Sequence, residues 1–182
     1  MRLKLDLHTH CQEALFYAQP TLETAQRIVE AVKAKGLDGI AITEHENAAF
    51  GYKIKELVEE HLGKPIIIVP GCEVDVARAQ IVELYFPEGL VFRFLAHPGY
   101  PWSIRIEDYL DQIQGIEVDN GLHRVALDLD KIDALAQKYD LLLLSNSDAH
   151  SLQAIGEYYN YIDLEELRRR ACAPMGKDAH HF

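Results

Sequence analysis

Short apolar runs alternate with segments of helical periodicity from one end of the sequence to the other. The runs are rich in Ile, Leu and Val, and several are apolar on both faces, which is typical of strands buried in a parallel sheet. They predict strands at residues 3–7, 38–43, 66–69, 80–86, 91–96, 115–119 and 141–145, with a weaker candidate at 158–162.

The segments between these runs repeat apolar residues three and four positions apart, as amphipathic helices do. Thr21 fits an N-cap, and Gly36 fits the position just after a helix ends. Strand–helix alternation along a whole chain predicts an α/β fold with parallel strands. The expected helices cover residues 21–35, 52–62, 104–113, 129–139 and 164–172.

The pattern indicates a single domain over residues 1–182. No internal repeat, linker or low-complexity segment divides it, and residues 173–182, which lack periodicity, are expected to form a C-terminal extension. A chain of 182 residues can bury one substantial core and is slightly short for a full eight-fold barrel.

Composition narrows the classes of function. The chain has 18 Lys and Arg against 29 Asp and Glu, a net charge of -11, so binding to nucleic acid without regard to sequence is not expected. Three cysteines without paired spacing disfavour a disulfide framework. No apolar run reaches the length of a membrane span, and the first residues lack a signal-peptide pattern. We therefore expect a cytoplasmic protein with no membrane attachment.

Histidines gather at the carboxyl ends of the predicted strands. Nine occur in the sequence, and the five that follow strand ends are His8, His10, His45, His97 and His150. The acidic residues in equivalent places are Glu44, Glu73, Glu117 and Asp148. The carboxyl ends of parallel strands meet at one rim, so we expect these side chains to converge there.

Their chemistry favours a metal site. Any one of these histidines alone would usually be a polar residue at the mouth of a loop, but imidazoles and carboxylates together suit Zn, Mn or Fe. Without a cation, the same cluster would bury carboxylates that repel each other. Of the other histidines, His123 could reach the rim from the loop after the sixth strand, whereas His61, His180 and His181 fit a helix end or the solvated tail.

The motifs DLHTH, ITEHE, PGCEVDV, LAHPG, IEVDNG and SNSDAH, in this order, resemble the successive motifs of the PHP family, the polymerase and histidinol phosphatase group of metal-dependent phosphoesterases. The resemblance runs from residue 4 to about residue 150. It implies a distorted (β/α)7 TIM-like barrel with two or three divalent metal ions, Zn, Mn or Fe, at the carboxyl-end rim.

Carried over by position, the resemblance implies three ion sites. A first ion would be held by His8, His10, Glu73 and Asp148; Glu73 would bridge to a second ion that His97 also binds; His45 and His150 would hold a third.

The sequence departs from the family pattern in three places. Glu13 is the only ionisable residue where many members carry a ligand of the third metal, and its spacing differs. Gln80 stands near the place where many members carry a His ligand of the second metal, and Glu44 replaces the more usual Asp. The second and third metals therefore each look short of a ligand.

The resulting expectation is a phosphoesterase that hydrolyses a small phosphomonoester or a short nucleotide through a metal-bound hydroxide. Asp148 or Glu44 would orient the water, and His150 or His123 would protonate the leaving group. Arg78 and Arg124, with His123, are the candidates for contact with the substrate phosphate.

Two alternatives remain open. A metal hydrolase of this kind could act on another ester or an amide, and a metal-stabilised module of the same fold could bind a ligand or partner without catalysis. The HPGYPW segment after His97 could form an aromatic wall of the pocket or a loop that covers it. The sequence does not specify an oligomeric state.

Overall fold

The structure is a computed structural model that describes residues 1–123 and 127–173. Its helices and strands alternate for most of the chain. In order they are β1 (Leu3–Asp6), α1 (Cys11–Ala14), α2 (Leu22–Ala34), β2 (Gly39–Ile42), α3 (Ala49–His61), β3 (Ile67–Val76), β4 (Ala79–Tyr85), the 3-10 turn η1 (Pro87–Gly89), β5 (Val91–Ala96), the 3-10 turn η2 (Ile106–Asp108), β6 (Gly115–Asn120), α4 (Leu129–Tyr139), β7 (Leu142–Asn146), β8 (Asn160–Ile162) and α5 (Leu164–Arg170).

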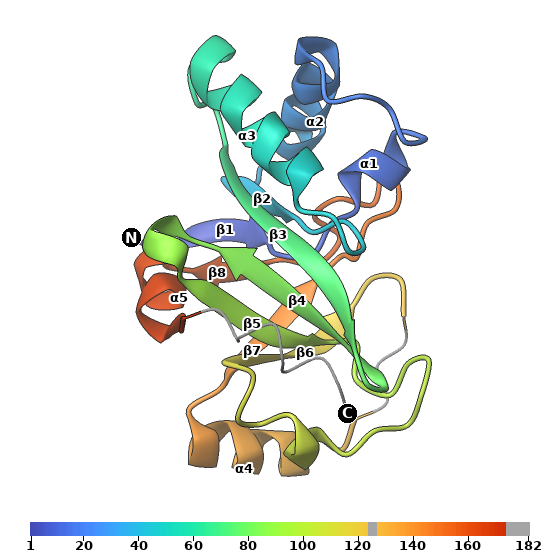
Figure 1. The fold of residues 1–182 in the computed structure, drawn as a ribbon, viewed down its shortest axis with the longest axis vertical. Coiled ribbons are helices and arrows are strands. Elements are labelled where there is room, and N and C mark those ends of the chain that lie inside the picture. Colours follow the sequence, from blue (N-terminus) through green and yellow to red (C-terminus); the bar gives the residue numbers. More distant parts are fainter. Residues whose placement is uncertain (124–126, 174–182) are drawn as a thin grey trace.

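The strands form one nearly closed eight-stranded sheet in the order β7-β6-β5-β4-β3-β2-β1-β8. Figure 1 shows α2 and α3 on one side of this sheet and α4 on the other. The predicted distorted TIM-like barrel of α/β class is therefore confirmed.

The prediction that all strands run parallel was wrong for part of the sheet. β4 is antiparallel to both β3 and β5, and β8 is antiparallel to β1. Only Ala77 and Arg78 join β3 to β4, and a parallel crossover needs a dozen or more residues. The predicted break between residues 69 and 80 is instead a long hairpin, in which Ala77 turns the chain with a φ of 54°.

The helix expected at residues 104–113 was also wrong, because only η2 forms there. Ile106, Tyr109 and Ile113 are buried against the outer face of β5 and β6, as a helical pattern would predict. The backbone reaches that burial through successive three-residue turns, such as the Tyr109 N–H donating to the Ile106 carbonyl at 3.0 Å. Apolar spacing reports which side chains are buried and does not by itself fix how the chain winds.

α2 has the ends that the sequence predicts, whereas α3 begins at Ala49, three residues before the predicted start at residue 52. The Thr21 hydroxyl accepts from the Thr24 N–H at the start of α2, and Gly36 follows that helix with a φ of 65°. α2 and α3 bury one face each against Ile40 and Ile42 of β2. Among the described residues, no helix is both long and apolar enough to cross a membrane.

Alternate residues of the strands point into the barrel and fill it. In β2, Ala41 faces inward while its neighbours face the helices. The interior cluster brings together Leu5, Leu7, Val69, Val82, Leu84, Phe92, Phe94 and Leu144, with Leu167 of α5 packed against it. This apolar filling supports the carboxyl-end rim, where polar side chains replace it.

The barrel closes between its first and last parallel strands in two ways. At the rim, the Asp148 N–H donates to the His8 carbonyl and the His10 N–H donates to the Ala149 carbonyl, both at 2.9 Å. Lower down, the Asn160 side chain stands in for a strand backbone, because it accepts from the Ser145 N–H and donates to the Ser145 carbonyl, both at 2.9 Å. A side-chain amide thus closes the gap between β7 and β8.

We expect Asn160→Ala to lower the free energy of unfolding by about 2–4 kcal/mol, because the Ser145 N–H and carbonyl lose the hydrogen bonds that the Asn160 side chain makes to them. Urea unfolding of the metal-free protein measures this. Tyr161→Ala is the matched control on the same strand, and since Tyr161 is 64% exposed, it should cost less than about 1 kcal/mol. Equal costs for the two variants would contradict the role given to Asn160.

Candidate metal centre

The rim brings together side chains from both ends of the chain. His8 and His10 follow β1, and Asp148 follows β7, where the two segments are paired. Glu73 lies inside β3 rather than after its end, since the hairpin extends that strand to Val76. His45 pairs with Glu73 through an isolated bridge. These five residues, which the sequence predicts at the rim, are therefore neighbours.

The first cluster joins His8, His10, Glu73 and Asp148, all of them almost fully buried. The Nε2 atoms of His8 and His10 are 3.1 Å apart. They lie 3.6 and 3.4 Å from the Glu73 carboxylate, and 3.5 and 3.2 Å from Asp148 Oδ1. The four groups that the sequence assigns to a first ion therefore face one another at close range.

The cluster fits a divalent ion by an observation on its own atoms. Asp148 Oδ1 is buried and has no hydrogen-bond partner, although two imidazole nitrogens lie near it. Atoms bound about 2.0–2.2 Å from one cation are separated by about 3.0–3.6 Å, which is the range found here. The ligand atoms of the cluster thus converge on a common point.

The two oxygens of Glu73 face different histidines. Oε1 is 3.1 Å from His97 Nε2, and Oε2 is 3.0 Å from His45 Nδ1. A carboxylate placed in this way can bridge two cations, one through each oxygen. The bridge between the first and second ions that the family resemblance implies for Glu73 stays a prediction.

His123 joins the rim beside His97. Its Nε2 is 3.7 Å from Asp148 Oδ2, its ring centroid is 4.8 Å from that of His97, and His97 Nε2 is 3.9 Å from the same Asp148 oxygen. The sequence assigned His123 to the substrate, whereas this position lets it complete a second ion site. Gln80, which stands near the place where many family members carry a His ligand, pairs with Asp75 and Ala96 in the sheet.

A third group joins His10, Glu13, His45 and His150, whose ligand atoms lie within 4.8 Å of one another. The Glu13 carboxylate is 3.9 Å from His45 Nε2 and 3.7 Å from His150 Nε2. Glu13 sits in α1, a single helical turn that the apolar pattern is too short to predict. That turn brings the Glu13 side chain back towards the rim. Glu13 therefore reaches the site although its position in the sequence differs from that of the ligand in many family members.

Charges within the rim are strongly coupled. Burial favours the neutral form of His8, but the carboxylates of Asp148, Glu117 and Glu73 outweigh it and raise the pKa of His8 well above its usual value. Burial lowers the pKa of His10 to about 4. Despite burial, His8 holds the pKa values of Glu73 and Asp148 far below their usual range. The carboxylates are therefore ionised at neutral pH, and binding of a cation would displace a proton from His8.

The backbone that carries these ligands is strained and braced. His97 has a φ of 24° and Asp148 a φ of 52°, which are unfavourable conformations for residues other than glycine. Buried Asp6 braces the second of them, because its carboxylate accepts from the Ser147 and Gly156 N–H groups at 3.1 and 2.9 Å. Burial nevertheless raises the pKa of Asp6 to about 6.

Glu44 occupies the edge of the rim. Its carboxylate accepts from the Gln12 N–H at 2.7 Å, and it belongs to none of the three clusters found among the described residues. Burial, with a smaller contribution from the Glu13 charge, raises the pKa of Glu44 to about 7. Its expected role in orienting water stays a prediction.

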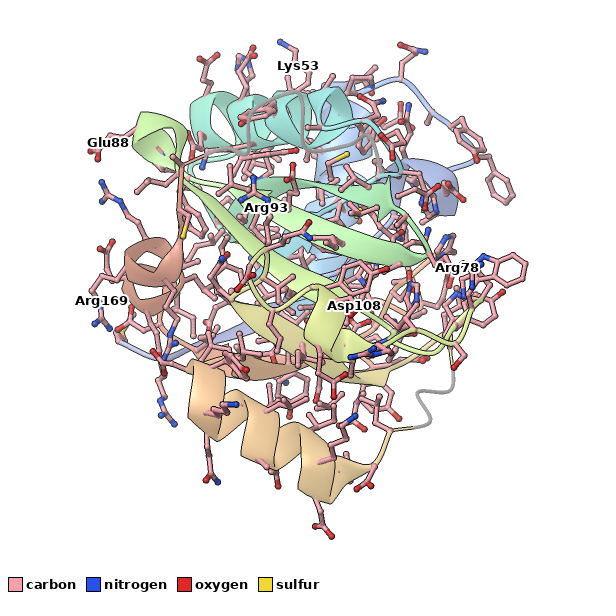
Figure 2. All side chains as sticks on the ribbon, turned by 60° about the horizontal axis from the view of Figure 1, so that its bottom comes forward. Lys53, Arg78, Glu88, Arg93, Asp108 and Arg169 are labelled. Atoms are coloured by element: carbon pink, nitrogen blue, oxygen red, sulfur yellow. The ribbon has the colours of Figure 1, made fainter. Side chains whose placement is uncertain are left out.

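The two arginines expected at the substrate phosphate have different outcomes. Arg78 is exposed at the tip of the β3–β4 hairpin and forms no ion pair with another described residue. Figure 2 shows it at the opposite end of the barrel from Glu88 of the β4–β5 turn, and hence at the carboxyl-end rim. Arg124 lies outside the described residues.

Tyr100, in the HPGYPW segment, packs against the rim. Its ring stacks on His123 with centroids 3.7 Å apart and an 18° angle between planes, and it meets His97 edge-on. Tyr100 is 47% exposed, and nearby Trp102 is 63% exposed. The segment therefore provides an aromatic flank beside the second cluster.

The barrel and its histidine–carboxylate rim form a candidate metal-binding site. The chain matches the family model described as PHP domain over residues 6–173, so it belongs to the PHP domain family. The uncharacterized protein MJ1587 of Methanocaldococcus jannaschii is 26% identical over 147 residues, covering 67% of this chain and 84% of that protein.

Solved structures share the fold at lower identity. A proposed metal-dependent phosphoesterase from Bifidobacterium adolescentis superposes with a TM-score of 0.69 at 15% identity, covering 92% of this chain and 96% of that one. An amidohydrolase from Chromobacterium violaceum with bound sulfate gives 0.63 at 16% identity over 96% and 99%. PsfC from Pseudomonas syringae gives 0.61 at 21% identity over 85% and 79%.

The raised pKa of Glu44 predicts a pH-dependent stability. It rises from 4.5 to about 7 on folding, so the stability it contributes is present below pH 4.5 and is lost as the pH rises through 7. Metal-free Glu44→Gln should therefore exceed the wild type in free energy of unfolding by about 3 kcal/mol at pH 8 and by less than about 1 kcal/mol at pH 5. Urea unfolding at both values measures this, and a pH-independent difference would contradict it.

Proposed function

We propose that this protein is a metal-dependent phosphoesterase that hydrolyses a small phosphomonoester or a short nucleotide. The observation that carries the proposal is the convergence of two ligand clusters on the shared carboxylates of Glu73 and Asp148, with a third cluster beside them. Adjacent divalent ions suit the transfer of a phosphoryl group, whose charge is spread over several oxygens. PHP family membership supports the same reaction class.

Each cluster has a proposed place in ion binding. His8, His10, Glu73 and Asp148 would hold the first ion; Glu73, His97, His123 and Asp148 the second; His10, Glu13, His45 and His150 the third. Bound divalent ions would activate a water molecule and neutralise the phosphate oxygens. Zn, Mn and Fe all suit this mixture of ligands.

The protein's own groups would orient the reactants. The Asp148 carboxylate, which lies between the first two clusters, is suited to hold the attacking water in place, and Glu44, whose pKa is raised to about 7, is the nearby carboxyl that can exchange a proton at neutral pH. His150 donates from Nδ1 to the Asp148 carbonyl at 2.9 Å, which leaves its Nε2 for Glu13 or a cation. We therefore favour His150 as a metal ligand over His150 as the acid that protonates the leaving group.

The substrate would be small and anionic. Arg78 is the cation proposed to meet the phosphate at the rim, with Arg124 a second candidate from the sequence, and Tyr100 would contact the organic group. A net charge of -11 disfavours a long polyanion. The cytoplasm remains the proposed location, consistent with the unpaired cysteines.

The test is to purify the protein without chelator, count bound metals by mass spectrometry and measure hydrolysis of p-nitrophenyl phosphate. We expect two or three ions per chain and turnover that falls at least about 10³-fold in His8→Ala and Asp148→Ala. Faster cleavage of p-nitrophenyl acetate would favour another ester or amide substrate. One ion or none, without turnover after Mn or Zn is restored, would favour the non-catalytic binding module.

Glu13 offers a selective variant. Glu13→Ala should remove one bound ion per chain and leave the first site occupied, because Glu13 contacts only the third cluster. Glu23→Ala, which removes an exposed acid from α2, is the control and should leave the metal count unchanged. Loss of every ion in Glu13→Ala would contradict the division into separate sites.

A further inference from the structure

Glu117 is a buried carboxylate of β6 that the proposed mechanism does not use. It is fully buried beneath the rim, yet it belongs to none of the metal clusters found among the described residues. Both of its oxygens are occupied. Oε1 lies 3.2 Å from His8 Nδ1 and accepts from Asn146 Nδ2 at 2.8 Å, while Oε2 accepts from the His97 N–H and from Asn120 Nδ2, each at 2.8 Å.

The orientation of the Asn146 amide is fixed by the backbone. Its Oδ1 accepts from the Leu7 N–H at 3.0 Å, and a backbone N–H can only donate. The NH₂ group of Asn146 must therefore be the end that faces Glu117. The same Oδ1 also accepts from Asn160 Nδ2 at 2.8 Å.

Asn160 is fixed in the same way. The Ser145 N–H donates to its Oδ1, so its NH₂ group points towards Asn146. The hydrogen bonds thus all point in one direction, from Asn160 in the gap between β7 and β8, through Asn146, to Glu117. With the Asn146 amide donating into Glu117 Oε1, that oxygen serves as an acceptor for His8.

The consequence falls on His8. A carboxylate oxygen that accepts at Nδ1 requires that nitrogen to carry the proton, so neutral His8 presents the Nε2 lone pair to the first cluster. Only a lone pair at Nε2 can bind a cation between His10, Glu73 and Asp148. The other oxygen of Glu117 holds the strained His97 backbone, and Asn120 also donates to Asp148 Oδ2 at 3.2 Å.

We propose that Glu117 is a positioning residue that selects the metal-binding tautomer of His8, with its own polarity set by the Asn160–Asn146 hydrogen-bond relay from the barrel seam. This proposal rests on the proposed function for the identity of the first cluster as an ion site. Partners of this kind, which orient a metal ligand from behind, are typically worth 10- to 100-fold in metal affinity.

The test is zinc affinity, measured by competition with a chromophoric chelator on the full chain. Glu117→Gln keeps the size of the side chain. Because donors face both oxygens of Glu117, the NH₂ group of the glutamine must face a donor in either orientation of the amide. We expect zinc to bind about 10- to 100-fold more weakly than it binds to the wild type. Unchanged zinc affinity would overturn the proposal.

Glu83→Gln is the matched control. Glu83 is another largely buried carboxylate, but it pairs with Arg93 at 2.7 Å, away from the rim clusters; Figure 2 shows Arg93 on the sheet. We expect it to lower the melting temperature and to leave zinc affinity unchanged. An equal loss of zinc affinity in Glu83→Gln would overturn the proposal, because general loosening would then explain the effect.

Asn146→Asp gives a second route if Glu117→Gln does not fold. It replaces the NH₂ group that faces Glu117 with an oxygen, so zinc should bind more weakly. Circular dichroism that matches the wild type would show that the variant is folded. Wild-type zinc affinity in the folded variant would contradict the proposed role of the Asn160–Asn146 hydrogen bonds. A wild-type protein that binds zinc but hydrolyses no phosphate ester would defeat the proposed function and leave this inference standing.

Discussion

The structure depends on concentrating negative charge at one end of a barrel whose interior is otherwise apolar. Glu73 and Asp148 are buried together, and in the free protein the charge of protonated His8 offsets their repulsion. Such a group of charges is costly to bury unless something compensates it. A divalent cation would compensate it more completely than a proton on His8, so the fold stores electrostatic energy that ion binding can release.

The supporting network explains why the rim keeps its shape. Glu117 and Asp6 lie beneath the ligands with their oxygens saturated by fixed donors, and neither belongs to a cluster that could hold a cation. Glu117 is anchored to Asn146 of β7 and to His97 after β5, and Asp6 is anchored to Ser147 and Gly156 after β7. The ligands are therefore held by hydrogen bonds below as well as by electrostatic attraction within the rim, and the strained backbone at His97 and Asp148 is retained.

Much of the rim was predictable from sequence, because strand ends in a parallel sheet converge and the histidines stand at those ends. His8, His10 and Asp148 follow that rule directly. Glu13 and His123 do not, since one depends on a helical turn of four residues and the other on a loop, and neither leaves a periodic signal. The antiparallel β4 was missed for a related reason: an apolar strand pattern does not reveal its direction, whereas the two-residue turn before it does.

The pairing of His8 with Asp148 also governs the order of events during synthesis. These residues are joined by a backbone hydrogen bond although about three quarters of the chain lies between them in sequence. A ribosome-bound chain that already displays His8 and His10 still lacks Asp148, so it has only fragments of the ion site to offer. Ion binding at the proposed site would therefore be a late step, open only to chains whose barrel has closed.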